Sequence, residues 1–358
     1  MCFDRIAAAF QLDGAIKTCE NFGHGHINHT LKVTTDTGAE YILQRINKYV
    51  FRNPVRLMNN VCSVTDYLRQ RCEDPQTALH YIPTHKGKFY HQDKEGDYWR
   101  MYDFVGGFCL DAPEDDNDFY QSALAFGQFQ KQLADFPAET LYETIPEFHN
   151  TIDRYRQFKE SVSVDACGRA ADVQEEINFM LEREELGGTL QRMRESGELP
   201  LRVTHNDTKL NNVLLSRETR KPLCVLDLDT VMPGLSLYDF GDSIRFGAAT
   251  AAEDEKDLSK VSMDLHMFEV YTRGYMEAAT TLTDKEVEML PMGALIMTLE
   301  CGVRFLKDHL DGDLYFKIAY PGHNLDRART QIKLVADMQS KWDEMNRIVA
   351  KLAAEIRQ

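Results

Sequence analysis

The sequence lacks a long apolar run. A membrane-spanning helix needs roughly 20 consecutive apolar residues, and no stretch of the 358 residues approaches that length. The first ten residues have neither the basic region nor the sustained apolar segment of a secretory signal, and they include the acidic Asp4. We therefore expect no membrane association and a cytoplasmic location.

Paired cysteines are also missing. Eight cysteines are scattered along the chain, and none belongs to a Cys-x-x-Cys motif. Disulfide frameworks and cysteine metal sites both depend on clustered or regularly spaced cysteines. Free thiols in a reducing compartment fit this spacing best.

Basic residues are too few for a nucleic-acid-binding surface. The chain has 41 basic against 57 acidic residues and a formal net charge of -16. Such a balance argues against non-specific binding to nucleic acids or to anionic membranes. We expect small molecules as its partners and take a monomer as the default.

Hydrophobic periodicity separates a β-rich beginning from a helical remainder. With 43% hydrophobic residues, the chain is long enough for two lobes, each with a core. Short strand-like runs occupy 15–19, 30–35, 41–45, 79–82 and 98–104. Asn53-Pro54 begins a helix, and apolar residues at 3-4 spacing predict helices over 119–136, 173–186, 259–279, 284–305 and 326–352.

These patterns predict an α+β fold with two lobes. We expect a small, β-rich, nucleotide-binding N-terminal lobe over 1–105 and a larger, mainly helical lobe over 106–358. Gly106-Gly107 would form the hinge, and 201–247 would be a largely non-helical block that holds most of the unusual residues. This plan is typical of the protein-kinase-like fold.

The segment from Val203 to Leu215 contains the residue types that phosphoryl transfer requires. Such a reaction needs a carboxylate to accept the proton of the attacking hydroxyl, and oxygen ligands for magnesium. Asp207 is the candidate general base, and Asn212 follows it by five positions, as in the kinase pattern H-R-D-x-x-x-x-N. His205 is expected to orient the loop. The alternative is a polar turn, where His, Asn and Asp are common.

A second carboxylate lies at the end of an apolar strand. The run Leu223–Asp229 ends in two aspartates, and Asp227 follows Asn212 by fifteen positions, which leaves room for a hairpin. Asp227 and Asn212 would be the oxygen ligands of Mg²⁺. A strand end with solvated carboxylates is the alternative.

The triplet Asp239-Phe-Gly241 resembles the metal-binding DFG motif of protein kinases, but it lies thirty-two residues after Asp207. Its neighbours Tyr238 and Asp242 indicate the start of a helix. We therefore expect Asp239 to be structural and to accept hydrogen bonds from the backbone of the catalytic loop.

A glycine hairpin between the first two strands fits a loop over nucleotide phosphates, because glycines let the backbone approach an anion closely. It spans Phe22–Asn28 and includes Gly23 and Gly25. The histidines at 24, 26 and 29 could alternatively form a metal cluster, but one or two of them facing the substrate is the favoured interpretation.

Taken together, these segments resemble the aminoglycoside phosphotransferase and choline kinase superfamily, and more narrowly the N-acetylhexosamine 1-kinases. The match extends over nearly the whole chain. The segments that carry it are Gly25–Asn28, Tyr41–Gln44, Leu201–Asn212, Asp227–Gly234, Asp239–Gly247, Glu253–Lys260, Glu300–Phe305 and Tyr320–Leu325.

The resemblance implies that ATP and N-acetylglucosamine or N-acetylgalactosamine give the sugar 1-phosphate and ADP. Asp207 would take the proton of the anomeric hydroxyl, with Asn212 and Asp227 on Mg²⁺. The residues that the resemblance assigns to the sugar, besides Asp207, are His26, Thr230, Phe246, Arg304 and Tyr315. Phe246 could equally be a core residue.

The nucleotide site departs from the usual kinase pattern. The position of the strand lysine is occupied by Gln44, with Arg45 or Lys32 as possible replacements, and no glutamate stands at the expected place on the following helix. The remaining candidates for binding ATP are Gly23, Gly25, Asn28, Tyr102, Phe104 and Val105, the last three at the expected adenine hinge.

Other functions stay open at this stage. A kinase of the same fold could phosphorylate choline, homoserine or an aminoglycoside. The missing lysine and glutamate leave room for a non-catalytic nucleotide-binding scaffold, and a metal-dependent hydrolase is a third alternative. The sequence does not decide between gluco and galacto sugars.

Overall fold

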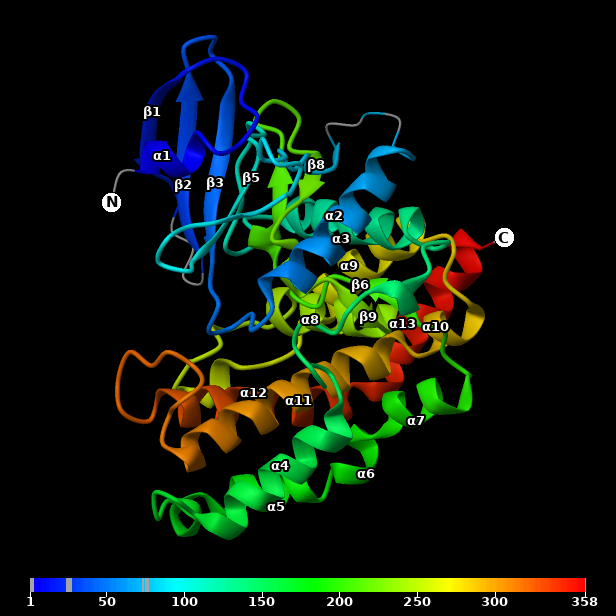
Figure 1. The fold of residues 1–358 in the computed structure, drawn as a ribbon. Coiled ribbons are helices and arrows are strands. Elements are labelled where there is room, and N and C mark those ends of the chain that lie inside the picture. The colour runs from blue at the N-terminus through cyan, green and yellow to red at the C-terminus, as the bar shows by residue number, and fades with distance from the viewer. Residues whose placement is uncertain (1–2, 24–27, 73, 75–76, 358) are drawn as a thin grey trace. The chain divides into compact units, whose positions relative to one another are not determined.

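The computed structural model describes residues 3–23, 28–72, 74 and 77–357. The chain divides into two units (Figure 1). The first contains residues 1–109, 135–146 and 213–233, and the second contains 110–134, 147–212 and 234–358. The architecture is a mixed α+β fold, with a small antiparallel sheet in the first unit and mainly helices in the second.

The first unit is built on a five-stranded antiparallel sheet with the strand order β1-β2-β3-β5-β4. Side chains alternate between the two faces of a strand, and one face buries Leu31, Leu43, Trp99 and Met101 in the core. The opposite face, called the polar face below, carries Lys32, Gln44 and Arg100 beside the apolar Ile42 and Ile46. The strands are β1 (Ile16–Asn21), β2 (His29–Thr35), β3 (Glu40–Ile46), β4 (His91–Gln92) and β5 (Tyr98–Asp103).

The helix that follows β3 confirms the predicted start at Asn53-Pro54. The side chain of Asn53 accepts a hydrogen bond from the amide of Arg56 at 3.1 Å, and Pro54 is the first helical residue. The remaining elements of this unit are α1 (Phe3–Ala7), α2 (Pro54–Arg69), η2 (Ala138–Thr140), β7 (Val213–Leu215), β8 (Pro222–Val225) and η5 (Leu228–Thr230).

The second unit packs around one central helix, α11 (Leu290–Asp311). Of its 22 residues, 17 are buried, and its first ten, 290–299, include no charged side chain, as expected for a helical segment that is packed on all sides. Helices α4, α8 and α12 pack against it, and α3 packs against α9; Figure 1 shows α11 and α12 side by side.

The helices of this unit are α3 (Asp116–Gln132), α4 (Thr151–Val164), α5 (Gln174–Leu181), α6 (Glu184–Gly187), α7 (Thr189–Ser196), α8 (Ser236–Gly247), α9 (Leu265–Ala278), α10 (Asp284–Glu288), α12 (His323–Ser340) and α13 (Trp342–Ile356). The short elements are η3 (Ala170–Val173), β6 (Arg202–Thr204), η4 (Leu210–Asn212) and η6 (Leu258–Lys260), while β9 (Met232–Gly234) crosses from one unit to the other.

Several predicted elements were wrong in type or extent. The run at 79–82 is not a strand, because only Tyr81 forms a bridge, to Tyr102. The helix predicted over 326–352 is two helices that meet at Lys341. Helix α4 was not predicted. Helix α8 occupies the end of the block predicted to be non-helical, although the helix start predicted around Asp239 is confirmed.

Among the described residues, no helix combines the length and the apolar character needed to cross a membrane.

Candidate active site

The loop after β6 places one carboxylate at the surface of the second unit. His205 is fully buried, between the rings of Phe126 and Phe129 at centroid distances of 5.5 and 6.1 Å. Asn206 has a left-handed backbone, with φ of 64°. The chain therefore turns sharply, and the side chain of Asp207 is 30% exposed while the histidine anchors the loop.

Two neighbours hold the carboxylate of Asp207. Asn212 donates from Nδ2 to Asp207 Oδ2 at 3.1 Å and to its backbone oxygen at 2.8 Å. Lys209 Nζ lies 3.1 Å from Asp207 Oδ1, and the negative charge of Asp207 raises the pKa of this lysine. Since the amide nitrogen of Asn212 is engaged, its Oδ1 remains as a possible metal ligand.

Lys209 was missing from the predicted site. The signal that could have found it is its spacing, two residues after the candidate base, in a loop where a cation would face any phosphate that Asp207 approaches.

Asp239 confirms its predicted structural role. Its two oxygens accept the amides of His205 and Asn206 at 2.9 and 2.8 Å, and Gln130 donates to it at 2.9 Å. Burial raises the pKa of this fully buried carboxyl group. The Asp-Phe-Gly triplet thus belongs to α8, and its aspartate holds the backbone of the catalytic loop by hydrogen bonds.

A second carboxylate of α8 supports the same loop. Asp242 accepts the amide of Thr208 at 3.2 Å, and Arg245 donates to its other oxygen at 2.9 and 3.1 Å. Burial alone would raise the pKa of Asp242, but the charges of Arg245 and Lys209 hold it below its usual value. The loop is therefore fastened at Asp239 and Asp242, one helical turn apart.

Asp227 belongs to the first unit, where it follows the antiparallel pair β7 and β8. Its backbone is left-handed, with φ of 51°, and the residue is exposed. Burial and then the nearby charges of Asp227 and Asp229 raise the pKa of Tyr102 on β5, whereas Arg100 opposes the shift. Asp227 therefore lies close to the polar face of the sheet.

A carboxylate and an amide oxygen, as in Asp227 and Asn212, suit the oxygen preference of Mg²⁺. The two residues belong to different units. No cluster of three or more His, Cys, Asp or Glu side chains suited to a metal occurs in the described part of the chain.

Gln44, which occupies the position of the usual lysine, is bonded to a buried arginine. Arg100 donates from Nε and Nη2 to Gln44 Oε1 at 2.9 and 2.6 Å, and it forms an ion pair with Asp229. Asn28 donates to the other oxygen of Asp229 at 2.7 Å. Two predicted residues, Asn28 and Gln44, are thus connected through the ion pair of Asp229 and Arg100. Arg100 was not predicted as part of this site.

Arg100 could have been found from strand periodicity. It stands between apolar and aromatic residues in 98–103, and the period of two places it on the same face as Tyr102, opposite the core residues Trp99 and Met101. A charged side chain there needs a partner, because an unpaired buried charge is costly.

The other predicted nucleotide residues have different positions on the sheet. Lys32 pairs with Glu40 at 2.7 Å and lies 3.8 Å from the ring centroid of Phe104. Arg45 pairs instead with Asp97 at 3.2 Å and points to the opposite face from Gln44. Val105 follows Phe104 on the segment after β5.

Gly23 has a left-handed backbone with φ of 74°, a conformation that glycine adopts readily. The predictions for Gly25 and His26 lie outside the described residues.

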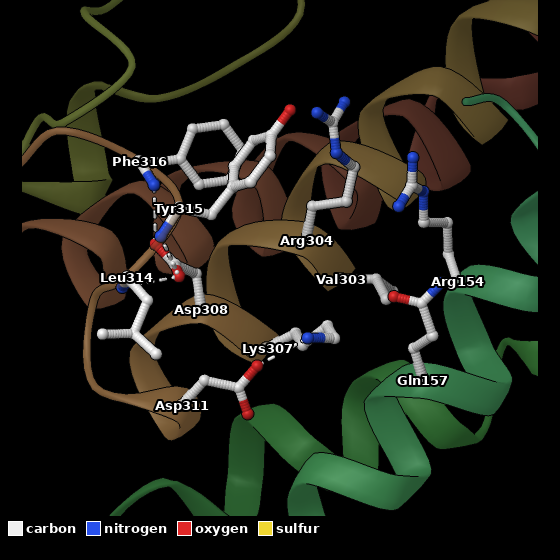
Figure 2. Close-up of a pocket in the computed structure, with 10 residues that line it drawn as sticks. All are labelled: Arg154, Gln157, Val303, Arg304, Lys307, Asp308, Asp311, Leu314, Tyr315 and Phe316. Atoms are coloured by element: carbon white, nitrogen blue, oxygen red, sulfur yellow. Dashed lines mark hydrogen bonds and ion pairs between the residues drawn. The ribbon is translucent and has the colours of Figure 1, made fainter. Parts of the chain in front are cut away.

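A pocket of about 290 Å³ in the second unit contains two of the predicted acceptor residues, Arg304 and Tyr315 (Figure 2). Helix α4 forms one wall, α11 the floor, and the 314–316 loop the opposite wall. The lining residues are Arg154, Gln157, Val303, Arg304, Lys307, Asp308, Asp311, Leu314, Tyr315 and Phe316.

The guanidinium of Arg304 is held by rings rather than by hydrogen bonds. It lies 5.2, 5.9 and 5.4 Å from the ring centroids of Phe148, Tyr315 and Phe316. Among the described residues, none accepts a hydrogen bond from it. Its donors therefore remain available to a ligand in the pocket, with aromatic faces around them.

Arg154 supplies a second guanidinium to the pocket. It donates from Nε and Nη2 to the backbone oxygen of Phe148, at 3.3 and 2.7 Å. Burial and then the charge of Arg304 lower the pKa of Arg154. Sequence reasoning missed this residue, because α4 itself was not predicted.

Asp308 shapes the loop that carries Tyr315. Its carboxylate accepts the amides of Leu314, Tyr315 and Phe316 at 2.8–2.9 Å, drawn as dashed lines in Figure 2. Asn324 donates to it at 2.9 Å. Asp308 therefore fixes the backbone of this loop, while the side chains of Leu314 and Tyr315 stay 81% and 65% exposed.

Phe246, at the end of α8, is partly buried and does not line this pocket; its ring centroid lies 6.0 Å from the guanidinium carbon of Arg245. Thr230 ends η5 in the first unit. Burial raises the pKa of Cys301 to about 11, and the charges that act on this thiol include Arg245, Arg304 and Asp242. The pocket therefore lies near the residues that anchor the catalytic loop.

A family model described as the phosphotransferase enzyme family matches residues 18–260. Among solved structures, a microcompartment-associated aminopropanol kinase is 16% identical, with a TM-score of 0.66, and the match covers 96% of this chain and 97% of that one.

Two further structures share the fold. An amicoumacin kinase solved with AMP-PNP, Ca²⁺ and amicoumacin is 14% identical, with a TM-score of 0.61 and coverage of 92% and 91%. An ethanolamine kinase from Plasmodium vivax is 12% identical, with a TM-score of 0.54 and coverage of 88% and 82%. The kinase-like fold predicted from the sequence is thereby confirmed.

Proposed function

We propose, since the chain belongs to the phosphotransferase enzyme family, that it transfers the γ-phosphoryl group of ATP to O1 of an N-acetylhexosamine. The products would be the sugar 1-phosphate and ADP, and the acceptor would be N-acetylglucosamine or N-acetylgalactosamine. Two features support this reaction: the carboxylate base of the catalytic loop, and the cationic and aromatic side chains of the pocket.

Asp207 is the general base of the proposed reaction. Its exposed carboxylate would accept the proton of the anomeric hydroxyl and aim the oxygen at the γ-phosphorus. The hydrogen bond from Asn212 fixes the rotamer of this carboxylate, and Lys209 is close enough to stabilise negative charge on the transferred group.

Asn212 and Asp227 would hold Mg²⁺, which when bound neutralises charge on the phosphates. The donor set fits, because the amide nitrogen of Asn212 is engaged with Asp207 and its oxygen is left for the ion. Asp227 is exposed at the end of its strand.

The polar face of the sheet in the first unit is the proposed nucleotide surface. Kinases usually have a strand lysine on this face, and here Gln44 occupies its position. The neighbouring cation is Arg100, which is paired with Gln44 and Asp229. The residues proposed to contact ATP are Gly23, Gly25, Asn28, Gln44, Tyr102, Phe104 and Val105. Arg45, predicted as a further contact, points to the opposite face and pairs with Asp97, so it is left out of this surface. Arg100 thus supplies a paired positive charge beside Gln44, where the usual kinase lysine is missing. This favours a catalytic nucleotide site over a scaffold that binds a nucleotide without transferring its phosphoryl group.

The observation that favours a sugar over the other acceptors is the pair of guanidinium groups in the pocket. Choline, ethanolamine and aminoglycosides are cations at neutral pH, and Arg154 and Arg304 would repel them. Asp308 and Asp311 do not reverse this preference, because the lining also includes Lys307, which pairs with Asp311 at 2.5 Å, and three cations face two carboxylates.

A neutral N-acetylhexosamine suits the same pocket. Arg304 can donate hydrogen bonds to ring hydroxyls or to the acetamido oxygen, while Tyr315 and Phe316 offer apolar faces to the pyranose ring. The resemblance also assigns His26, Thr230 and Phe246 to the acceptor, and these three stay separate proposals. Phe246 does not line this pocket, Thr230 belongs to the first unit, and His26 lies outside the described residues.

The test is an acceptor screen by ADP release, followed by phosphorus NMR of the product. We expect turnover with N-acetylglucosamine or N-acetylgalactosamine and a phosphate on the anomeric oxygen. Glucosamine, with its ammonium group, should react much more slowly than its N-acetyl form. Product phosphorylated at any other oxygen, or faster turnover of choline or an aminoglycoside, would refute the proposal.

A further inference from the structure

A chain of polar contacts in the second unit leads from the catalytic loop toward the 314–316 loop. It begins at Asp242, which accepts the amide of Thr208 and is paired with Arg245. Arg245, which is 6% exposed, donates from Nη1 to Glu253 Oε1 at 2.6 Å. The catalytic loop is thereby connected to Glu253, a residue of the 253–260 segment that the proposed chemistry does not use.

The second half of this path of contacts begins at the other carboxylate oxygen of Glu253. Arg327 Nε lies 3.8 Å from Glu253 Oε2, and Arg327 Nη1 donates to Asn324 Oδ1 and to the backbone oxygen of Lys317, both at 3.3 Å. Asn324 donates to Asp308, whose carboxylate accepts the amides of the 314–316 loop. In this path of contacts among described residues, Glu253 joins the half that begins at Thr208 to the half that ends at Tyr315.

One contact in this chain is long. Arg327 Nε is buried, and no described residue accepts a hydrogen bond from it, although Glu253 Oε2 lies 3.8 Å away. A buried N–H without a partner is unfavourable, so a small movement of Arg327 toward Glu253 would be stabilising. Such a movement would pull on Asn324 and Lys317, which flank the acceptor wall of the pocket.

We propose that Glu253 is a positioning residue that couples the acceptor-binding loop, 314–316, to the catalytic loop, 205–208. Glu253 touches neither the acceptor nor the phosphates. It acts through Arg245 and Asp242 on one side and through Arg327, Asn324 and Asp308 on the other. When an acceptor binds in the pocket against Tyr315, it restricts the movement of the 314–316 loop. The contacts of Glu253 then restrict the movement of the backbone beside Asp207 as well.

The test that does not depend on the acceptor is hydrogen exchange of the free protein. Glu253→Gln keeps the shape of the side chain but removes its charge. We expect amide exchange in both 205–208 and 314–316 to rise by about tenfold, because a hydrogen bond to a charged group contributes roughly that factor or more. Faster exchange in only one of the two loops, or in neither, would overturn the coupling.

Glu255→Gln is the matched control. Glu255 belongs to the same segment and is exposed to a similar degree, 25% against 28%, but it contacts Lys260 and the amide of Asp257 instead of the two arginines. Its variant should leave exchange in both loops unchanged.

The kinetic part of the proposal rests on the proposed function, and a double-mutant cycle tests it. With N-acetylglucosamine, or the acceptor that the screen identifies, Glu253→Gln and Asn324→Ala should each lower kcat/KM for the acceptor at least fivefold and leave KM for ATP unchanged. The double variant should be no worse than the poorer single variant, as for two links of one chain. Losses that multiply would refute coupling through Glu253, whatever the acceptor proves to be.

Discussion

The side chains around Asp207 illustrate how much chemistry a short loop contains. Asp207, Lys209 and Asn212 lie within six positions of one another, and their mutual contacts measure 2.8–3.1 Å. One side chain donates to each carboxylate oxygen, so the base has a defined orientation before any substrate arrives. Preorganisation of this kind lowers the cost of aligning the attacking oxygen.

Asp207→Asn removes the proposed general base with little change in shape. We expect kcat to fall by roughly 10² to 10⁴, the usual range for loss of such a group, while ATP still binds. Steady-state rates and calorimetric titration with ATP measure the two effects separately. Turnover at the wild-type rate would exclude Asp207 from this role.

Two other aspartates differ in their expected response to magnesium. Asp227→Asn should raise the Mg²⁺ concentration for half-maximal rate by tenfold or more, because a carboxylate ligand becomes a neutral one. Asp239→Asn should leave that concentration unchanged but destabilise the protein by about 1–3 kcal/mol, since one loop amide loses its buried acceptor. Metal titrations and urea unfolding of both variants check this, and a magnesium effect confined to Asp239→Asn would reverse the assignment.

At the level of elements, the contact between α8 and α11 determines how the catalytic loop is held. Ten of the twelve residues of α8 are buried, including Asp239 and Asp242, whose carboxylates bond the loop. The two helices approach closely at a pair of glycines. A Cβ on Gly241 would lie 2.3 Å from the backbone oxygen of Gly293, and one on Gly293 would lie 2.8 Å from that of Leu237.

Gly241→Ala should therefore destabilise the fold by about 1–3 kcal/mol through overpacking, and it should lower kcat because α8 carries the loop anchors. Gly302→Ala, in α11, is the control. Its Cβ would meet the flexible end of Met180 at 2.7 Å and the Cβ of Gln331 at 3.1 Å, and no backbone atom. The gain in helix propensity, up to about 1 kcal/mol, offsets part of these contacts, so the loss should be smaller than for Gly241→Ala. Equal losses of unfolding free energy in the two variants would contradict a tight α8–α11 contact.

At the scale of the whole molecule, buried carboxylates make stability depend on pH. Glu286 is 1% exposed and accepts hydrogen bonds from Arg202 at 2.5 and 2.7 Å and from Ser236 at 2.7 Å. Burial alone would raise the pKa of Glu286, but the bonds from Arg202, the Thr283 amide and Ser236 hold it below the ordinary value of 4.5.

The depressed pKa means that the stabilising contribution of Glu286 is present above pH 4.5 and is lost as the pH falls through the lower, folded-state value. Glu286→Gln should cost about 3 kcal/mol at pH 7, as for breaking a buried pair, and the difference from wild type should shrink below pH 4.5. Urea unfolding at several pH values measures it. Glu288→Gln, at an exposed pair, should change little, and a pH-independent difference for Glu286 would contradict the shifted pKa.

Strand and helix types could be predicted where periodicity extends over a whole element. The alternation in β2, β3 and β5 and the cap at Asn53 depend on neighbours along the chain, so they could be read locally. Element ends were harder to predict. The break at Lys341 between α12 and α13 and the loss of the strand at 79–82 depend on which side chains the rest of the fold leaves to pack against.

What the sequence determined by itself is the local chemistry of the loop at Asp207 and the family plan of a β-rich and a helical part, because both depend on spacing over a few residues. Only the tertiary structure revealed Arg100 beside Gln44, Arg154 beside Arg304 and the chain through Glu253. These partners lie between 8 and 150 positions apart. Their contacts come from the packing of separate elements, and a pattern along the chain contains no measure of that packing.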